Sequence, residues 1–230
     1  MPAPSTSRRV RKTQHERTTE STERLLAAAI ELFAAQGYEN TTTEQIAERA
    51  GYSRAMVNAR FGSKEGLLES MLNTEWEGLL LGAVTTDAPG MSRIVGVVDA
   101  LRLLVEQEAV RLRAFMNVSF EATGPNPEVR PHIQDRLGRI EEAFAEAMTA
   151  GMRDGTIRED LDPAFEAREF IHSGIGGTYR WLIDPDFDFS AYLVDWRAAV
   201  IRRLAAPAPS TTSAQRSQRR PSRGQRPTAR

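Results

Sequence analysis

Between residues 53 and 61, side chains that can read nucleic acid alternate with apolar ones in the stretch SRAMVNARF. Val57 and Phe61 are four residues apart, so on a helix they share one face and can anchor it to a domain. Arg54, Ala55 and Asn58 then face outward. An arginine can donate two hydrogen bonds to guanine and an asparagine can pair with adenine, each worth about 1–3 kcal/mol of discrimination. The small Ala55 lets such a helix sit deep in a groove.

Further residues extend this face. Ala59 is also small, and Arg60 adds positive charge at its edge. Lys64 lies in the first turn of the next helix, where free backbone N–H groups suit a phosphate. Each charge alone could be an ordinary solvated side chain. The interpretation as a nucleic-acid contact rests on their combination with the anchors and with the turn that precedes them.

Two short helices joined by a glycine-containing turn position this face. Residues 42–50 predict one helix, capped by a threonine at 42 or 43, and Gly51 ends it. Ser53 is expected to cap the helix that carries the outward face. Such a pair is the helix-turn-helix signature. Apolar residues at a helical period predict a first helix from Ser21 to Gly37, and a connector helix runs from Ser63 toward Gly82.

The remainder of the chain predicts helices and shows no alternating strand pattern. Helices are expected over about 92–121 with a break near 107–111, over 128–153, from Asp162–Pro163 to about 184, and over 190–205. The fold class is therefore all-α, with an N-terminal three-helix helix-turn-helix domain followed by a helical bundle. The predicted organisation is a flexible basic arm (1–19), the DNA-binding domain (20–66), an effector-binding and dimerisation domain (67–206) and a disordered arginine-rich tail (207–230).

The net charge of −1 conceals an uneven distribution. Residues 1–66 carry 10 basic and 8 acidic side chains, residues 67–206 carry 14 and 23, and residues 207–230 carry 6 arginines and no acid. The basic N-terminal part and the basic tail are suited to binding a polyanion, whereas the acidic middle part is expected to have another function.

Several kinds of chemistry are excluded or disfavoured. The chain has no cysteine, and its three histidines (His15, His132, His172) lack ligand-like spacing, so no metal site and no cofactor are expected. No serine or acid pairs with a histidine at a persuasive spacing, so no catalytic residues are assigned. No segment is long and apolar enough to span a bilayer, and the basic N-terminus lacks the apolar stretch of a secretory signal. We expect a cytoplasmic protein without a membrane partner.

The N-terminal third resembles the TetR family of bacterial regulators, in its AcrR-like branch. The matching elements are LLAAAIELFAAQGYENTTTEQIAERAGYS, then Phe61, Ser63, Lys64, Glu65 and Leu67–Leu68. Weaker similarity continues through LRAFMNVSFEA and MRDGTIREDLDP. The resemblance implies an all-helical homodimer that binds double-stranded operator DNA and carries a small-molecule effector in its C-terminal domain.

The resemblance also assigns roles to single residues. Thr43 and Lys64 would contact phosphate, and Arg54, Ala55, Asn58 and Arg60 would face the groove. The family usually has Tyr in place of Asn58 and commonly His in place of Arg60. Asn58 could instead read a base and Arg60 could restore a phosphate contact, so the operator is expected to differ from common ones.

An apolar effector pocket is expected in the C-terminal domain. Its candidate lining residues are large apolar side chains with one histidine as the polar group: Trp76, Phe115, Met116, Phe120, Phe144, Met148, His172 and Tyr179. Methionines among them would adapt to an apolar ligand. For any one of these side chains, simple core packing is the alternative.

A two-fold interface is expected on the last two helices. Glycine costs a helix up to about 1 kcal/mol per residue, and close helix approach would compensate. The candidate interface residues are glycines and large side chains at helical spacing: Gly174, Gly177, Trp181, Trp196, Val200 and Leu204. Two recognition helices could then enter successive major grooves of a near-palindrome.

The sequence thus predicts a ligand-responsive transcriptional regulator, most often a repressor in this family, released by a small apolar molecule. Two alternatives remain. An enzyme would need a nucleophile–base pair or paired carboxylates in a cleft. A nonspecific nucleic-acid-binding protein would use the arginine-rich arm and tail, and its affinity would fall steeply with salt but ignore sequence.

Overall fold

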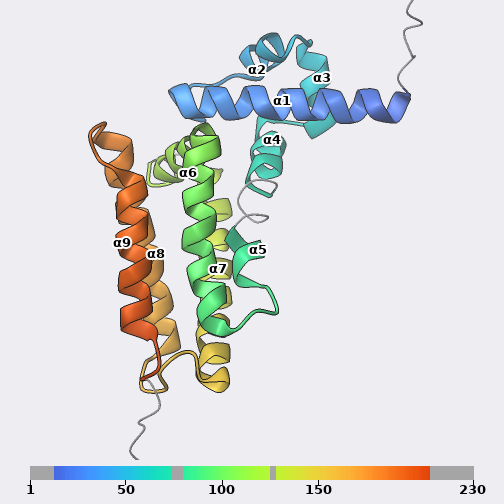
Figure 1. Ribbon diagram of the computed structural model, residues 1–230. Coiled ribbons are helices and arrows are strands. Elements are labelled where there is room, and N and C mark those ends of the chain that lie inside the picture. Colours follow the sequence, from blue (N-terminus) through green and yellow to red (C-terminus); the bar gives the residue numbers. More distant parts are fainter. Residues whose placement is uncertain (1–12, 74–79, 125–127, 208–230) are drawn as a thin grey trace, which may run out of the picture.

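The computed structural model describes residues 13–73, 80–124 and 128–207. Helix α1 lies across one end of a bundle made by α6 to α9, and α2 and α3 lie on the far side of α1 from that bundle (Figure 1). The helices are α1 (Gln14–Gln36), α2 (Thr43–Ala50), α3 (Arg54–Phe61), α4 (Lys64–Met71), α5 (Gly82–Val84), α6 (Gly90–Glu121), α7 (Val129–Asp154), α8 (Pro163–Ile183) and α9 (Phe189–Leu204). Over these ranges the only β pairing is an isolated bridge between Ile157 and Ala205. The all-α prediction is confirmed.

Helix α1 begins seven residues before the predicted start. Thr13 is its N-cap: the Thr13 hydroxyl accepts from the Glu16 N–H at 3.2 Å, and the Glu16 carboxylate accepts from the Thr13 N–H at 2.6 Å. This capping box satisfies two N–H groups that a helix start leaves unpaired. Ser21, the predicted start, is buried mid-helix and donates to the Thr18 carbonyl. Residues 13–19 of the predicted flexible arm are therefore helix or its cap; residues 1–12 lie outside the described residues, as does the predicted tail beyond Pro207.

The N-terminal core forms where the apolar face of α1 meets α2, α3 and α4. Leu25, Ala29 and Phe33, at the predicted helical spacing, are fully buried. Val57 from α3 and Leu67 from α4 pack in the same cluster and are also fully buried. Burying a large apolar side chain contributes about 1.5–3 kcal/mol, so a few such residues hold the three short helices against α1.

Helix α6 is broken at Glu108, whose φ of −142° and ψ of 41° are not helical. The predicted break near 107–111 is confirmed. It separates a first segment, which includes Val97 and Leu101, from a second that includes Phe115 and Glu121. The change of direction lets the second segment pack beside α1 while the first remains in the bundle (Figure 1).

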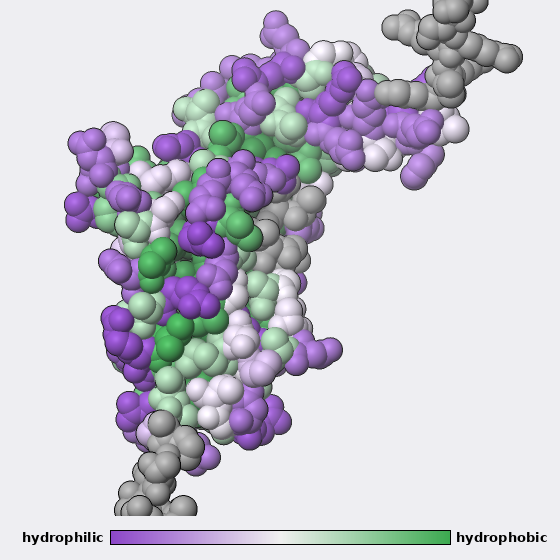
Figure 2. Space-filling view, viewed as in Figure 1, coloured by the Kyte–Doolittle hydropathy of each residue, from purple (hydrophilic) through white to green (hydrophobic). Residues whose placement is uncertain are grey.

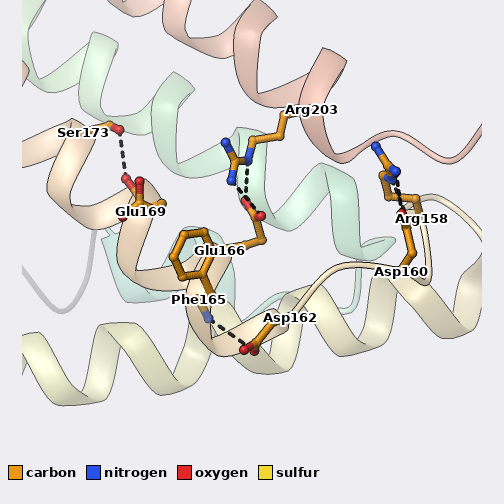
Figure 3. Close-up of polar contacts among 8 residues, drawn as sticks. All are labelled: Arg158, Asp160, Asp162, Phe165, Glu166, Glu169, Ser173 and Arg203. Carbon is orange, nitrogen blue, oxygen red and sulfur yellow. Dashed lines mark hydrogen bonds and ion pairs between the residues drawn. The ribbon is translucent and has the colours of Figure 1, made fainter.

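Polar contacts fix the start of α8 and its approach to α9. Asp162 caps α8 and accepts from the Ala164 and Phe165 N–H groups at 3.0 and 3.3 Å, as the Asp-Pro pair predicts. Figure 3 shows Glu166 facing Arg203 of α9. The guanidinium donates to both carboxylate oxygens at 2.6 and 2.9 Å, and the Glu166 side chain is only 6% exposed. This bidentate pair orients α9 along α8.

Candidate DNA interface and apolar cavity

The turn between α2 and α3 has the geometry that the sequence predicts. Gly51 is left-handed, with φ 76° and ψ 30°, a conformation that favours glycine. The Tyr52 N–H donates to the Ala47 carbonyl at 2.8 Å, which closes the end of α2. Ser53 precedes α3, but its hydroxyl makes no capping hydrogen bond. Ser53 therefore occupies the predicted N-cap position without the side-chain hydrogen bond, and its side chain is exposed beside the start of α3.

Helix α3 divides into an inner and an outer face. Val57 is fully buried, and Phe61 is half-buried against the N-terminal core. Arg54, Ala55 and Asn58 are exposed on the opposite side. The predicted outward placement of these three residues is confirmed, because one helix period determines which side chains the anchors turn away from the domain.

An acidic residue, Glu44, joins two of the predicted DNA contacts. Its carboxylate lies 2.6 Å from the Arg54 guanidinium and accepts from the Thr43 hydroxyl at 3.1 Å. The pKa of Glu44 is lowered, first by its own backbone N–H, then by the Thr43 hydroxyl and the Arg54 charge. Glu44 thus holds Arg54 at the junction of α2 and α3. The sequence places Glu44 in the first turn of α2 but gives no signal of this contact.

Arg60 and Lys64 contact the protein itself. The Arg60 side chain is half-buried, and its Nε donates to the Ser21 hydroxyl at 2.8 Å. The Lys64 ammonium donates to the carbonyls of Tyr38 and Thr41, both at 3.0 Å, and lies 4.1 Å from the centre of the Tyr38 ring. Burial lowers the pKa of Lys64. Lys64 therefore ties the start of α4 to the segment after α1, and the predicted phosphate contact of its ammonium group stays a prediction.

The bundle encloses an apolar cavity of about 210 Å³. Helices α6 to α9, with Leu80 and Thr123 from outside them, supply its wall. The lining residues are Leu80, Val97, Leu101, Leu112, Phe115, Met116, Ser119, Phe120, Thr123, Ile133, Leu137, Ile140, Phe144, Phe170, Ile171, Gly174, Ile175, Thr178 and Trp196. The rings of Phe144 and Phe170 are 4.3 Å apart between centroids, and those of Phe170 and Trp196 are 4.6 Å apart. These three aromatic rings form a continuous wall from α7 through α8 to α9.

Half of the predicted pocket residues line this cavity: Phe115, Met116, Phe120 and Phe144. Met148 is instead buried in the bundle core beyond the cavity. The His172 side chain is 66% exposed, with Nδ1 3.8 Å from Glu169, and Tyr179 is 48% exposed with its ring edge on Phe120. Trp76 lies outside the described residues.

Helix period explains why His172 and Tyr179 are absent from the cavity wall. Phe170, Gly174 and Thr178 are spaced by four residues on α8 and face the cavity. His172 and Tyr179 are spaced by seven residues, so they share a different, exposed face of the same helix. Phe170 and Trp196 are the aromatic lining residues that the sequence does not assign to the pocket. Their apolar character is visible in the sequence, but the helix faces that meet are not.

The predicted interface residues mostly face into the subunit, which corrects their assignment. A Cβ at Gly177 would overlap the Tyr192 ring, and one at Gly174 would be 3.1 Å from Trp196. The two glycines therefore allow α9 aromatics to approach α8 within one chain. Val200 and Leu204 are buried in the bundle core. Trp181 stacks on Phe189 at 5.6 Å between centroids, with the Arg113 guanidinium over its ring.

A different set of side chains on α8 and α9 is apolar and exposed. Phe165, Tyr179, Ile183 and Val194 are 45–62% exposed. On α8, residues 165, 172, 179 and 183 are separated by seven, seven and four residues, so they share one face. Figure 2 shows hydrophobic surface along the bundle, whereas hydrophilic surface covers most of the outer end of α1.

The second segment of α6 connects the cavity to the DNA-binding domain. Phe115, Met116 and Phe120 line the cavity, and Glu121, at the end of the same segment, accepts from the backbone N–H groups of Tyr38 and Glu39 at 2.9 Å each. A Cβ at Gly37 would overlap the Glu121 carboxylate, so only glycine leaves room for this contact.

A second polar contact supports this connection. Asn117 donates to the Ala34 carbonyl near the end of α1 at 2.9 Å. One short helix segment therefore forms part of the cavity and also holds the C-terminal end of α1.

Residues 25–71 match the sequence model of the bacterial regulatory proteins of the tetR family. The chain belongs to the TetR family. TetR-family membership makes it a DNA-binding transcriptional regulator rather than an enzyme, and the helix-turn-helix lies within the matched residues. The finer assignment to the AcrR-like branch stays a prediction.

Similarity to TetR-family relatives extends beyond the matched domain. The transcriptional repressor AcnR of Corynebacterium glutamicum is 26% identical over 168 residues, which cover 70% of this chain and 81% of AcnR. FadR of Bacillus subtilis, solved in complex with stearoyl-CoA, has a TM-score of 0.67 at 19% identity, over 78% of this chain and 97% of FadR. A regulator from Saccharomonospora viridis, solved with choline, has a TM-score of 0.68 at 21% identity, over 82% and 100% of the two chains.

Neither a metal site nor a membrane-spanning helix is found among the residues that the structure describes. Across residues 13–73, 80–124 and 128–207, no group of histidine and acidic side chains is arranged to hold a metal ion. Within the same ranges, no helix has the length and hydropathy that crossing a bilayer requires.

Proposed function

We propose that this TetR-family protein is a ligand-responsive repressor that binds a near-palindromic operator as a homodimer. A small, mainly apolar molecule in the cavity between α6 and α9 releases it from DNA. The observation that carries the proposal is the second segment of α6, because one face of it lines the cavity while Glu121 at its end is bonded to the segment that follows α1.

The outer face of α3 supports the DNA-binding part of the proposal. Arg54 and Asn58 are exposed with base-reading chemistry, and Ala55 between them leaves room for close approach. Thr43 lies at the start of α2, and its hydroxyl donates to Glu44; on DNA a phosphate would replace Glu44 as the acceptor. Arg60 would contribute from the edge of this face. AcnR, of which the alignment covers 81%, is a repressor, which supports repression as the mode of action.

The contacts of α6 support a route for release. A ligand shifts an equilibrium only between states that it binds differently. A ligand that moves Phe115 or Phe120 would also move Glu121, because all three lie on the same helix segment. Glu121 would then carry the displacement to Tyr38 and so to the end of α1. The predicted connector through α4 would act in parallel; most of its residues between α4 and α5 lie outside the described ranges.

The exposed apolar side chains on α8 and α9 support a homodimer through these helices. Phe165, Tyr179, Ile183 and Val194 would be covered by the same face of a second copy. A two-fold axis there would place two α3 helices for successive major grooves, and a palindromic operator would follow from that symmetry. FadR and the Saccharomonospora regulator were solved with small molecules, which supports a small-molecule effector for this chain.

A mobility-shift assay on DNA that flanks the gene of this protein tests the proposal. We expect sequence-specific retardation by the wild-type protein and a marked loss with Arg54→Ala. A protein that instead binds every DNA fragment equally, and loses binding when residues 207–230 are deleted, would be a nonspecific nucleic-acid-binding protein. That result would contradict the proposal.

A further inference from the structure

The polar groups of the cavity wall are few, and most of them are hydroxyls. Among the described residues, no charged side chain lines the cavity. Its polar side-chain groups are the hydroxyls of Ser119, Thr123 and Thr178 and the indole N–H of Trp196, whose ring presents its carbon edge to Gly174. Thr178 is the most enclosed, because only 3% of its surface is exposed and it lies on α8 close to the aromatic wall. Polar recognition by this part of the wall therefore comes mainly from hydroxyl groups.

Each of these hydroxyls already donates its proton within its own helix or turn. The Thr178 hydroxyl donates to the Gly174 carbonyl at 2.8 Å, Ser119 to the Phe115 carbonyl at 2.8 Å, and Thr123 to the Phe120 carbonyl at 2.7 Å. A hydroxyl has one proton to donate and two lone pairs to accept. The lone pairs are what remain for a ligand, so the wall offers hydrogen-bond acceptors.

This wall discriminates against ionised ligands. A carboxylate has no proton to donate to an acceptor, and moving it from water into an apolar site without a partner is costly. A quaternary ammonium ion also lacks a hydrogen-bond donor. The faces of Phe144, Phe170 and Trp196 can attract it, but no carboxylate in the described lining would neutralise it, and burying an unpaired charge costs more than this attraction contributes. A neutral molecule with one O–H group can instead donate to a threonine oxygen and bury the rest of its surface.

We propose that the cavity takes a neutral, mainly apolar molecule that carries a hydroxyl group, and that Thr178 accepts the hydrogen bond from that hydroxyl. The inference rests on the proposed function only in treating this cavity as the effector site. It specifies a ligand chemistry distinct from the anionic stearoyl-CoA and the cationic choline found with the two solved relatives.

Isothermal titration calorimetry on the full-length protein with four probes of one chain length tests this chemistry. The probes are 1-octanol, its methyl ether 1-methoxyoctane, octanoate and octyltrimethylammonium. We expect 1-octanol to bind best, the ether to bind about threefold to tenfold more weakly because it lacks the donor, and both ions to bind at least about tenfold more weakly. Octanoate or octyltrimethylammonium binding as tightly as 1-octanol would overturn the proposal, as would the absence of binding by all four probes.

The role of Thr178 is tested by Thr178→Val, which keeps the shape of the side chain and removes the acceptor. We expect 1-octanol to bind about threefold to tenfold more weakly and 1-methoxyoctane to bind as before. Thr149→Val is the matched control, since Thr149 makes the same hydrogen bond to the carbonyl four residues earlier but is exposed on α7 outside the cavity. An equal loss for both probes would show that Thr178 acts only on packing and would overturn its role as acceptor.

The mobility-shift assay separates this inference from the proposed function. Tight 1-octanol binding by a protein that recognises no operator would contradict the proposed function and support the ligand chemistry. Release from a specific operator by octanoate but not by 1-octanol would support the proposed function and overturn the ligand chemistry.

Discussion

The outer face of α3 and the wall of the cavity are both made of helix surfaces, but they are built differently. On α3, one helix supplies Arg54, Ala55 and Asn58, and the buried Val57 determines which way they point. The cavity wall requires Phe144, Phe170 and Trp196 from three helices to meet. A site within one helix depends on a local period, whereas a site between helices depends on how the whole bundle packs. The two regions should therefore respond differently to substitution.

The largest expected effects come from placing a negative charge on the inner or on the outer face of α3. Val57→Asp would bury an unpaired charge in the N-terminal core and destabilise that domain by about 3–5 kcal/mol. Ala55→Asp, on the exposed face, should change the free energy of unfolding by less than about 0.5 kcal/mol, yet it should abolish operator binding by repelling phosphates. Thermal denaturation and a mobility-shift assay on both variants measure these effects. Equal destabilisation by the two would contradict the assigned faces.

Removing a base-reading side chain should have the next largest effect. Arg54→Ala should weaken operator binding by about 1–3 kcal/mol without lowering stability. The Arg54–Glu44 ion pair that it removes is exposed on both sides and contributes little to folding. Arg102→Ala on α6, which removes another exposed ion pair, is the control and should leave operator affinity unchanged. Fluorescence anisotropy with a labelled operator measures both, and equal affinities for the two variants would refute the role of Arg54.

A substitution at Glu121 tests the connection between the two regions. In Glu121→Gln, an amide NH₂ would replace one of the two oxygens that accept from Tyr38 and Glu39. We expect a loss of about 1.5–3 kcal/mol in stability, typical of hydrogen bonds to a charged group. The ratio of operator affinities without and with 1-octanol should also fall several-fold. Glu106→Gln, in an exposed ion pair on α6, is the control. An unchanged ratio would mean that release does not pass through Glu121.

Lys64 provides the smallest expected effect on DNA binding. Because its ammonium group bonds two backbone carbonyls, Lys64→Gln should lower the free energy of unfolding by about 1–3 kcal/mol. The slope of log Kd against log salt concentration for the operator should not change. Loss of a phosphate contact would instead reduce that slope by about 0.9 for each subunit of the dimer. A reduced slope at unchanged stability would restore Lys64 to the DNA interface.

The extent to which the sequence predicts this molecule follows the same division. Period and capping residues predict most helices, the turn at Gly51, the break in α6 and the outward face of α3, because these depend on neighbours within a few residues. The early start of α1 is missed because its capping box at Thr13 lies in a polar stretch without an apolar period. Local capping chemistry there extends the helix beyond its buried part.

Tertiary packing accounts for the remaining corrections. Gly174 and Trp196 have the composition of an interface, and sequence alone cannot show that they meet each other at the cavity instead. Lys64 likewise has the composition of a phosphate contact, but it binds carbonyls from a segment more than 20 residues away. Composition and spacing define what a side chain can do, and the packing of distant elements decides which of these roles it has.

Selection of binding sites from a random DNA library tests the central claim most directly, with the wild-type protein and Asn58→Ala compared under the same conditions. We predict that the wild-type protein enriches a near-palindromic site, and that Asn58→Ala enriches the same site but loses its preference at one base pair in each half. No enrichment by the wild-type protein, or identical preferences for both proteins at every position, would contradict the assignment of α3 as the helix that reads DNA.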